Sequence, residues 1–177
     1  MNKNSDLPYY LLMIVFFVIL KLAYTLVETN HLTFLLSPTS QLIEFVSGFQ
    51  SVYVNNKGYH FQQLNIVIDK SCAGFNFLIL NFLMLSFLSL KYFKKRKNKI
   101  IAILISLIGA YIFTILINSF RINAAIIFED RISSFVNLKR DIIHQSIGII
   151  INLTFLILIY LITEKKLNHK KANEKLT

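Results

Sequence analysis

The chain has 177 residues, of which 55% are hydrophobic, and its formal net charge is +10. A soluble domain of this length is less apolar, and the apolar residues gather in runs long enough to cross a bilayer, so the composition indicates an integral membrane protein. The single cysteine excludes an intrachain disulfide and a zinc site built on several cysteines. Most of the positive charge lies in short segments beside the apolar runs, which is typical of anchoring at anionic lipid and argues against nucleic-acid binding.

Four membrane spans are predicted, in chain order, at about residues 8–27, 73–90, 100–121 and 142–162. An apolar helix needs about 20 residues to cross ~30 Å of hydrocarbon, and each run reaches or nearly reaches that length. The first run follows a short positive leader, as in a signal peptide, but no small-residue cleavage site follows it, so we expect an uncleaved anchor. The predicted fold is therefore an all-α polytopic transmembrane bundle, formed by residues 1–177 as one domain.

The basic residues predict the orientation of the spans. Segments 1–7, 91–99 and 163–177 hold one, six and five of the 19 Lys and Arg residues. Because strongly basic loops stay in the cytoplasm, we expect segment 91–99 to be cytoplasmic, and the C-terminal tail lies two spans further on. Both termini should then be cytoplasmic, and the loops at 28–71 and 122–141 should lie outside.

The first outer loop begins with a predicted helix. In the stretch SPTSQLIEFVSGF, Ser37 is expected as the cap, Pro38 in the first turn and Gly48 as the stop. The spacing of the apolar residues in this stretch predicts a short amphipathic helix on the membrane surface. A fifth, re-entrant membrane segment at residues 32–47 is the alternative.

The same loop continues with a predicted β-hairpin. Aromatic and β-branched residues lie on both sides of the turn-forming group NNKG at residues 55–58. This small extracytoplasmic hairpin would lead the chain back to the membrane at Asp69.

The only cysteine, Cys72, lies at the start of the second span. Asp69 or Ser71 can cap this span, which would put Cys72 in the first helical turn, where unpaired backbone N–H groups favour an anion. A thiolate at such a position is a reactive nucleophile. The alternative is a free cysteine that packs as a small hydrophobic residue.

Two further polar groups lie in apolar surroundings. Arg121 follows Asn118 by one helical turn in the third apolar run, and an arginine in a bilayer usually faces a partner or a wet cavity; snorkelling to head groups is the alternative. His144 lies at the start of the fourth span, and it is either a catalytic residue or an ordinary interfacial histidine. Gly148 lies on the same helical face and allows another helix or a substrate backbone to approach closely. The span directions predict that Cys72, Arg121 and His144 share the outer side of the membrane, at similar depth.

Three motifs in this chain, SCAGFNFL, NSFR and HQSIG, resemble those of the exosortase and archaeosortase family of membrane enzymes. That family shows a Cys followed by a small residue and Gly, then Asn-x-x-Arg, then His-x-x-x-Gly, each at the outer face of a span. The matching residues are Cys72, Ala73, Gly74, Asn118, Arg121, His144 and Gly148. The resemblance covers about residues 65–160, the catalytic half of longer members, so the chain is similar to the short types such as exosortase K. Spans that could hold a substrate in the longer members have no counterpart here.

The resemblance implies a bacterial inner-membrane cysteine peptidase or transpeptidase that cuts C-terminal sorting signals from exported proteins. Such a signal comprises a short motif, a hydrophobic helix and a basic cluster. Cys72 would form a thioester acyl-enzyme, His144 would transfer protons and Arg121 would stabilise the oxyanion. Five further residues are expected to support the site or position the substrate: Asn118, Gly74, Gly148, Ser71 and Asp69. No cofactor or metal is expected.

The resemblance leaves three questions open, namely the motif that is cleaved, whether an amine or water receives the acyl group, and the oligomeric state. The expected partners are the tailed exported proteins and membrane lipid, and no nucleic acid. A function of a different class is the alternative: a small non-catalytic subunit of a membrane assembly or transporter. In that case Cys72 would pack, Arg121 would snorkel and His144 would bind a neighbouring protein.

Overall fold

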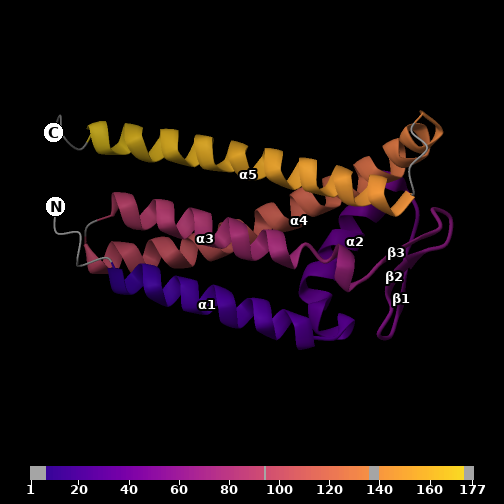
Figure 1. Cartoon of the computed structure of the whole chain (residues 1–177), viewed down its shortest axis with the longest axis horizontal. Coiled ribbons are helices and arrows are strands. Elements are labelled where there is room, and N and C mark those ends of the chain that lie inside the picture. Colours follow the sequence, from indigo (N-terminus) through magenta and orange to yellow (C-terminus); the bar gives the residue numbers. More distant parts are fainter. Residues whose placement is uncertain (1–6, 94, 136–139, 174–177) are drawn as a thin grey trace. The chain divides into compact units, whose positions relative to one another are not determined.

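The structure is a computed structural model that describes residues 7–93, 95–135 and 140–173 (Figure 1). Parts of the two terminal basic segments, at residues 1–6 and 174–177, lie outside the described residues, as do residues 136–139 of the predicted second outer loop. The described residues form five α-helices and a small three-stranded antiparallel sheet. The predicted fold class, a helical membrane protein with a small β element, is confirmed.

The helices are α1 (Leu7–Leu26), α2 (Thr33–Ser47), α3 (Phe75–Tyr92), α4 (Arg96–Phe135) and α5 (Arg140–Asn173). The strands, between α2 and α3, are β1 (Val52–Val54), β2 (Gly58–Phe61) and β3 (Ile66–Ile68). One-turn 3-10 helices precede α2 and α3, and they are η2 (Thr29–Leu32) and η3 (Lys70–Cys72). In the described part of the chain, four helices are long and apolar enough to cross a membrane, so the protein is an integral membrane protein.

Helix α4 is longer than the span that the apolar pattern predicts. We expected the third span to end at residue 121 and residues 122–141 to form an outer loop, but α4 continues to Phe135. The expected loop conformation of residues 122–135 is therefore wrong, and their location outside the membrane stays a prediction. Between Ala110 and Phe135 the sequence contains neither Gly nor Pro, so nothing in it stops the helix.

Helix α5 also extends beyond its predicted span. It begins at Arg140 and ends at Asn173, whereas the apolar run ends at residue 162. The residues that follow, TEKKLNHKKAN, include Glu, Lys, Leu and Ala, which are good helix formers, so the helix continues after the apolar residues stop. Helices α1 and α3 agree with their predicted spans to within two residues at each end.

The chain divides into two compact units. Unit 1 comprises residues 1–26, 76–113 and 156–177, and unit 2 comprises residues 27–75 and 114–155. Unit 1 therefore contains α1, nearly all of α3, the first part of α4 and the last part of α5. Unit 2 contains α2, the sheet and the remaining parts of α4 and α5. The single domain stays a prediction.

In unit 1, α1 is the helix that is most open to its surroundings. Its one buried side chain is Met13, and Leu12 is 69% exposed, as expected where hydrocarbon rather than protein covers a helix. An edge-to-face contact between Phe16 and Phe82 joins α1 to α3. Such an aromatic pair contributes about 0.5–1.5 kcal/mol beyond the burial of its area.

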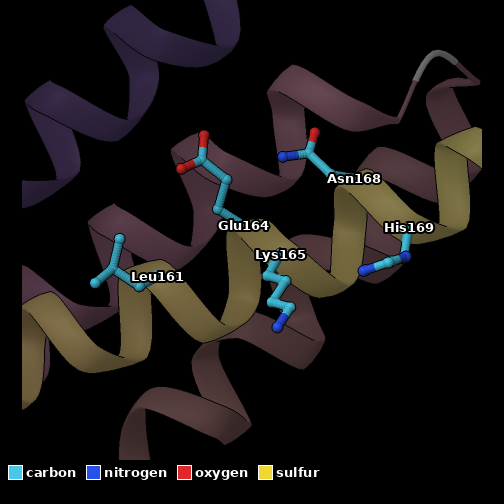
Figure 2. Close-up of a pocket in the computed structure, with 5 residues that line it drawn as sticks. All are labelled: Leu161, Glu164, Lys165, Asn168 and His169. Carbon is cyan, nitrogen blue, oxygen red and sulfur yellow. The ribbon is translucent and has the colours of Figure 1, made fainter.

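Helix α5 is joined to the end of α3 by polar contacts in unit 1. The Lys91 ammonium lies 3.3 Å from the Glu164 carboxylate, and the Tyr92 hydroxyl donates a hydrogen bond of 2.7 Å to Asn168 Oδ1. Figure 2 shows Glu164 and Asn168 extending from the same side of α5, beside an open pocket that they line with Leu161, Lys165 and His169.

In unit 2, α2 buries one face. The buried residues, spaced as one helical stripe, are Leu35, Leu36, Thr39, Ser40 and Ile43. Because this stripe begins upstream of Ser37, the helix starts at Thr33. The predicted cap at Ser37 and the first-turn position of Pro38 are therefore wrong, and Pro38 lies inside the helix.

The predicted end of α2 at Gly48 is confirmed. Gly48 has φ 75°, and its N–H donates to the Glu44 carbonyl at 2.8 Å, which is the left-handed cap that glycine favours. Phe45 and Val46 are 87% and 66% exposed on the protein surface. Contact of this face with the membrane surface, and the re-entrant alternative, both stay predictions.

The sheet confirms the predicted hairpin and adds a third strand that was not predicted. Val54 pairs with Gly58 across the NNKG turn, and Tyr59 pairs with Ile68 on the other side of β2. Gly58 has φ 98°, and a Cβ there would lie 2.2 Å from the Ile68 carbonyl oxygen, so only glycine fits. The close contact between Gly58 and Ile68 helps to fix the position of β3, and β3 leads directly into η3.

Candidate active site

Cys72 ends the single turn of η3, and Asp69 caps this turn. The Asp69 carboxylate accepts hydrogen bonds from the backbone N–H of Ser71 at 2.9 Å and from the Ser71 hydroxyl at 2.6 Å. The backbone N–H of Cys72 donates to the Asp69 carbonyl at 3.0 Å. Of the two predicted caps, Asp69 is the one that accepts, and Ser71 is its donor. Together they fix the backbone of the cysteine.

The prediction that Cys72 lies in the first turn of the long helix is wrong. Helix α3 begins only at Phe75, and Gly74 between them has φ 71°. This left-handed conformation interrupts the helix, and glycine adopts it without steric cost. Cys72 belongs to the turn before the helix, so the predicted effect of the helix terminus on its thiol does not carry over. The Ser71 hydroxyl oxygen lies 3.7 Å from Cys72 Sγ, while its hydrogen is donated to Asp69.

Asn118 on α4 connects that helix to the cysteine turn. Its side chain is 2% exposed, and its Nδ2 donates a hydrogen bond of 2.6 Å to the backbone carbonyl of Cys72. Gly74 makes room for this contact, since a Cβ on Gly74 would lie 3.0 Å from Asn118 Cγ. Gly74 and Asn118, which belong to different predicted motifs, therefore pack against each other next to Cys72.

Arg121 lies one turn after Asn118 on α4 and packs against Gly148 of α5. A Cβ on Gly148 would lie 3.2 Å from Arg121 Nη1 and 3.4 Å from its Cδ. The Arg121 Nε and Nη2 atoms are buried, and no residue in the described part of the chain accepts a hydrogen bond from them. Leaving buried donors unpaired costs free energy, so these two N–H groups are suited to a ligand oxygen.

His144 lies one turn before Gly148 on α5, on the same helical face. The side chains of His144 and Arg121 both interact with the Cys72 thiol, and the guanidinium does so electrostatically. All three residues belong to unit 2. Segments that are far apart in the sequence thus bring together the three side chains that the sequence analysis singled out.

The sequence analysis missed the contribution of α2 to this site. Ser119, next to Asn118, donates its hydroxyl to the Ile115 carbonyl at 2.8 Å and approaches the Thr39 carbonyl at 3.4 Å. Helix α2 therefore supports α4 at the level of the site. The contact uses the backbone carbonyl of Thr39, so no side-chain pattern in the sequence could have revealed it.

The arrangement is suited to nucleophilic chemistry at a carbonyl carbon. It combines a thiol, an imidazole that interacts with it and two buried guanidinium donors, which are the groups that acyl transfer requires. Among the side chains that the structure describes, no three His, Cys, Asp or Glu residues are grouped so as to hold a metal ion.

Gly74→Ala is expected to lower the thermal stability and disturb the site. The left-handed backbone costs a residue with a Cβ about 1–2 kcal/mol, and the new methyl group would meet Asn118 Cγ at 3.0 Å. Thermal unfolding in detergent and the rate of Cys72 labelling by a maleimide measure the two effects.

Gly48→Ala is the matched control, because Gly48 has φ 75° but a Cβ there would meet nothing within 4 Å. It should cost backbone strain alone and leave the labelling rate unchanged. If the two variants behave alike in both measurements, the close packing of Gly74 against Asn118 is not functional.

No family model matches the chain, and comparisons with curated proteins and with solved structures also found no match.

Proposed function

We propose that this protein is a membrane cysteine peptidase or transpeptidase of the exosortase type, which cuts C-terminal sorting signals from exported proteins. The observation that carries the proposal is that the side chains of Arg121 and His144 both interact with the Cys72 thiol. In the family that the motifs resemble, these positions hold the nucleophile, the cation and the proton carrier.

In the first step, the sulfur of Cys72 attacks the carbonyl carbon of the scissile peptide bond. His144 takes the thiol proton, and the tetrahedral intermediate forms with a negative charge on the former carbonyl oxygen. When the C–N bond breaks, His144 returns the proton to the leaving amine. The products are a thioester between Cys72 and the new C-terminus and a released hydrophobic tail with a free amino group.

Arg121 is assigned to the negative charge that develops in this step. Its buried Nε and Nη2 have no acceptor among the described residues, so they are available to an oxyanion. Donors that are already oriented in a water-poor site are typically worth ~2.7–4 kcal/mol of the activation barrier. Gly148 supports this role because the absence of a side chain lets the guanidinium lie against α5.

In the second step, an amine or a water molecule attacks the thioester, and His144 accepts its proton. The C–S bond then breaks, and His144 returns the proton to the departing sulfur, which restores the thiol and the neutral imidazole. An amine gives transfer of the exported protein to a surface acceptor, and water gives simple hydrolysis. Asn118 keeps the backbone carbonyl of Cys72 fixed through both steps by its 2.6 Å hydrogen bond.

The proposed location is the bacterial inner membrane, with both termini and the basic segment 91–99 in the cytoplasm. The active site would then face the periplasm, where sorting signals of exported proteins arrive. The basic cluster at the end of such a signal would stay on the cytoplasmic side, in agreement with the positive-inside bias.

A non-catalytic membrane subunit is the competing function, and Arg121 argues against it. An arginine that only packs or snorkels would direct its donors to water, head groups or protein acceptors. Two buried and unpaired guanidinium donors beside a hydrogen-bonded thiol are better explained by a substrate that brings its own oxygen.

Thiol labelling distinguishes the two functions without a known substrate. Because Cys72 is the only cysteine, a membrane-impermeant maleimide reports on a single group. Added to the outer face of spheroplasts, it should label the wild-type protein at least about tenfold faster than His144→Ala or Arg121→Gln, since thiolate rather than thiol reacts.

The control is Cys72→Ser combined with Asn55→Cys, which puts an ordinary thiol on the exposed β1–β2 turn. Its labelling rate should not change when His144→Ala is added. Equal rates for Cys72 in all three backgrounds would favour the subunit function. Labelling only from the cytoplasmic face would contradict the proposed orientation.

A further inference from the structure

Unit 1 contains an elongated cavity of about 540 Å³ between α3, α4 and α5. Its walls include Leu85 of α3, Ala102 and Gly109 of α4, and Leu167 of α5. The volume falls in the range of about 300–1,000 Å³ that is typical of ligand pockets. None of the residues assigned to catalysis lines it, so it is separate from the proposed active site.

The lining favours an apolar occupant over water. Two of its polar side chains, Ser89 and Ser106, bond to each other at 3.3 Å, and Ser106 also donates to the Ala102 carbonyl at 2.7 Å. A water molecule needs two to four polar partners to occupy a cavity. The hydroxyl groups of Ser89 and Ser106 already make hydrogen bonds within the protein. An empty cavity would lose the dispersion contacts of its walls, so hydrocarbon is the occupant that fits best.

The length of the cavity matches an acyl chain. Its lining on α4 runs from Asn98 to Phe113. At 1.5 Å per residue this part of the helix rises roughly 22 Å. One leaflet of hydrocarbon is about 15 Å thick, half of the ~30 Å core. A single acyl chain can therefore lie along the cavity with its head group at the Asn98 end.

The residues next to Asn98 in the sequence are rich in positive charge. Asn98 belongs to the segment KYFKKRKNK at 91–99, which has six basic and no acidic residues. Lys95, Arg96 and Lys97 are all exposed at the start of α4. An apolar groove that ends at exposed cations is complementary to a molecule with a hydrocarbon chain and an anionic head.

From these observations we infer that the cavity binds one anionic phospholipid, with an acyl chain between α3, α4 and α5 and its phosphate beside Lys95, Arg96 and Lys97. The hydrophobic tail of a sorting signal fits less well. A helix is about 10 Å wide and needs a broader space between α3, α4 and α5 than a single acyl chain does. The basic cluster of such a tail would also meet like charges at this end.

Native mass spectrometry of the full-length protein, released from detergent, tests the inference. The probes are phosphatidylglycerol and phosphatidylcholine with identical acyl chains. Wild-type protein should retain a single phosphatidylglycerol, with at least about a tenfold preference over phosphatidylcholine. Equal retention of the two lipids, or retention of neither, would overturn the inference.

Three variants locate the bound lipid. Ala102→Phe fills the cavity without changing any charge and should reduce retention of phosphatidylglycerol at least about tenfold, and Gly109→Leu should do the same if Ala102→Phe fails to fold. Ile108→Phe is the control, because Ile108 is 61% exposed and does not line the cavity. Wild-type retention in both cavity variants would place the lipid elsewhere and refute the inference.

A variant that combines Lys95→Gln, Arg96→Gln and Lys97→Gln tests the role of the positive charges in lipid binding. This variant should bind phosphatidylglycerol no better than phosphatidylcholine, and an unchanged preference would contradict the role of the cations. Displacement of the lipid by a synthetic apolar helix with a basic end would instead assign the cavity to a sorting tail. Since Cys72 takes no part in these measurements, their outcome is independent of the proposed activity.

Discussion

Replacing Cys72 with serine is expected to abolish cleavage of an exported reporter that carries a sorting signal. The reporter tail, a short motif followed by an apolar helix and a basic cluster, is taken from a protein of the same organism. Removing the nucleophile of such a group lowers turnover by at least about 10³-fold, and His144 is oriented toward a thiol in this site. Immunoblotting of the reporter shows the loss as persistence of the uncleaved form.

The variant should accumulate and unfold like the wild-type protein, because serine is nearly the same size and the hydrogen bonds of η3 use the backbone of residue 72. Adding Asn55→Cys restores a thiol on the same unit but should not restore cleavage. Full cleavage by Cys72→Ser would end the peptidase proposal.

Arg121→Gln is expected to lower the rate of reporter cleavage by about 10²–10³-fold, the ~2.7–4 kcal/mol that a lost oxyanion donor typically costs. The unfolding temperature should stay within about 4 °C of the wild-type value, since ~1 kcal/mol shifts a chain of this size by 2–4 °C. The reason is that Nε and Nη2 of Arg121 make no hydrogen bond to the described part of the protein. Little stability is lost when they are removed.

Lys57→Gln is the matched control, because it removes one positive charge at an exposed position of unit 2. It should leave both cleavage and unfolding unchanged. If Arg121→Gln lowers the unfolding temperature in proportion to its loss of activity, Arg121 is a structural residue and the oxyanion role is wrong.

The ends of a helix could be predicted where the apolar run and the helix begin and end at nearly the same residues. Helices α1 and α3 agree with their apolar runs because capping or turn signals lie close to the ends of those runs. The end of α4 could not be predicted from hydropathy, because the helix continues to Phe135 without Gly or Pro after the predicted span ends at residue 121. The start of α2 was missed because tertiary burial of Leu35 and Leu36 overrides the cap signal of Ser37.

The candidate site could be predicted as a set of residues but not as a geometry. The order of the motifs and the expected directions of the spans predicted that Cys72, Arg121 and His144 would lie near one another, and in the structure their side chains interact. The left-handed backbone of Gly74 was not foreseen, because a glycine in a helical pattern is compatible with either conformation. The supporting contact between Ser119 and Thr39 joins residues that are distant in sequence, and no local pattern contains that pairing.

Asn118 and Arg121 have a mechanical consequence because they occupy the same helix, one turn apart. Asn118 donates a hydrogen bond to the backbone carbonyl of Cys72. A shift of α4 along its axis would therefore move the backbone of Cys72 and the Arg121 guanidinium together. Membrane helices shift and tilt as the bilayer thins or thickens around them. This link favours a constant spacing between the Cys72 backbone and the Arg121 guanidinium when the thickness of the membrane changes, as the proposed chemistry would require.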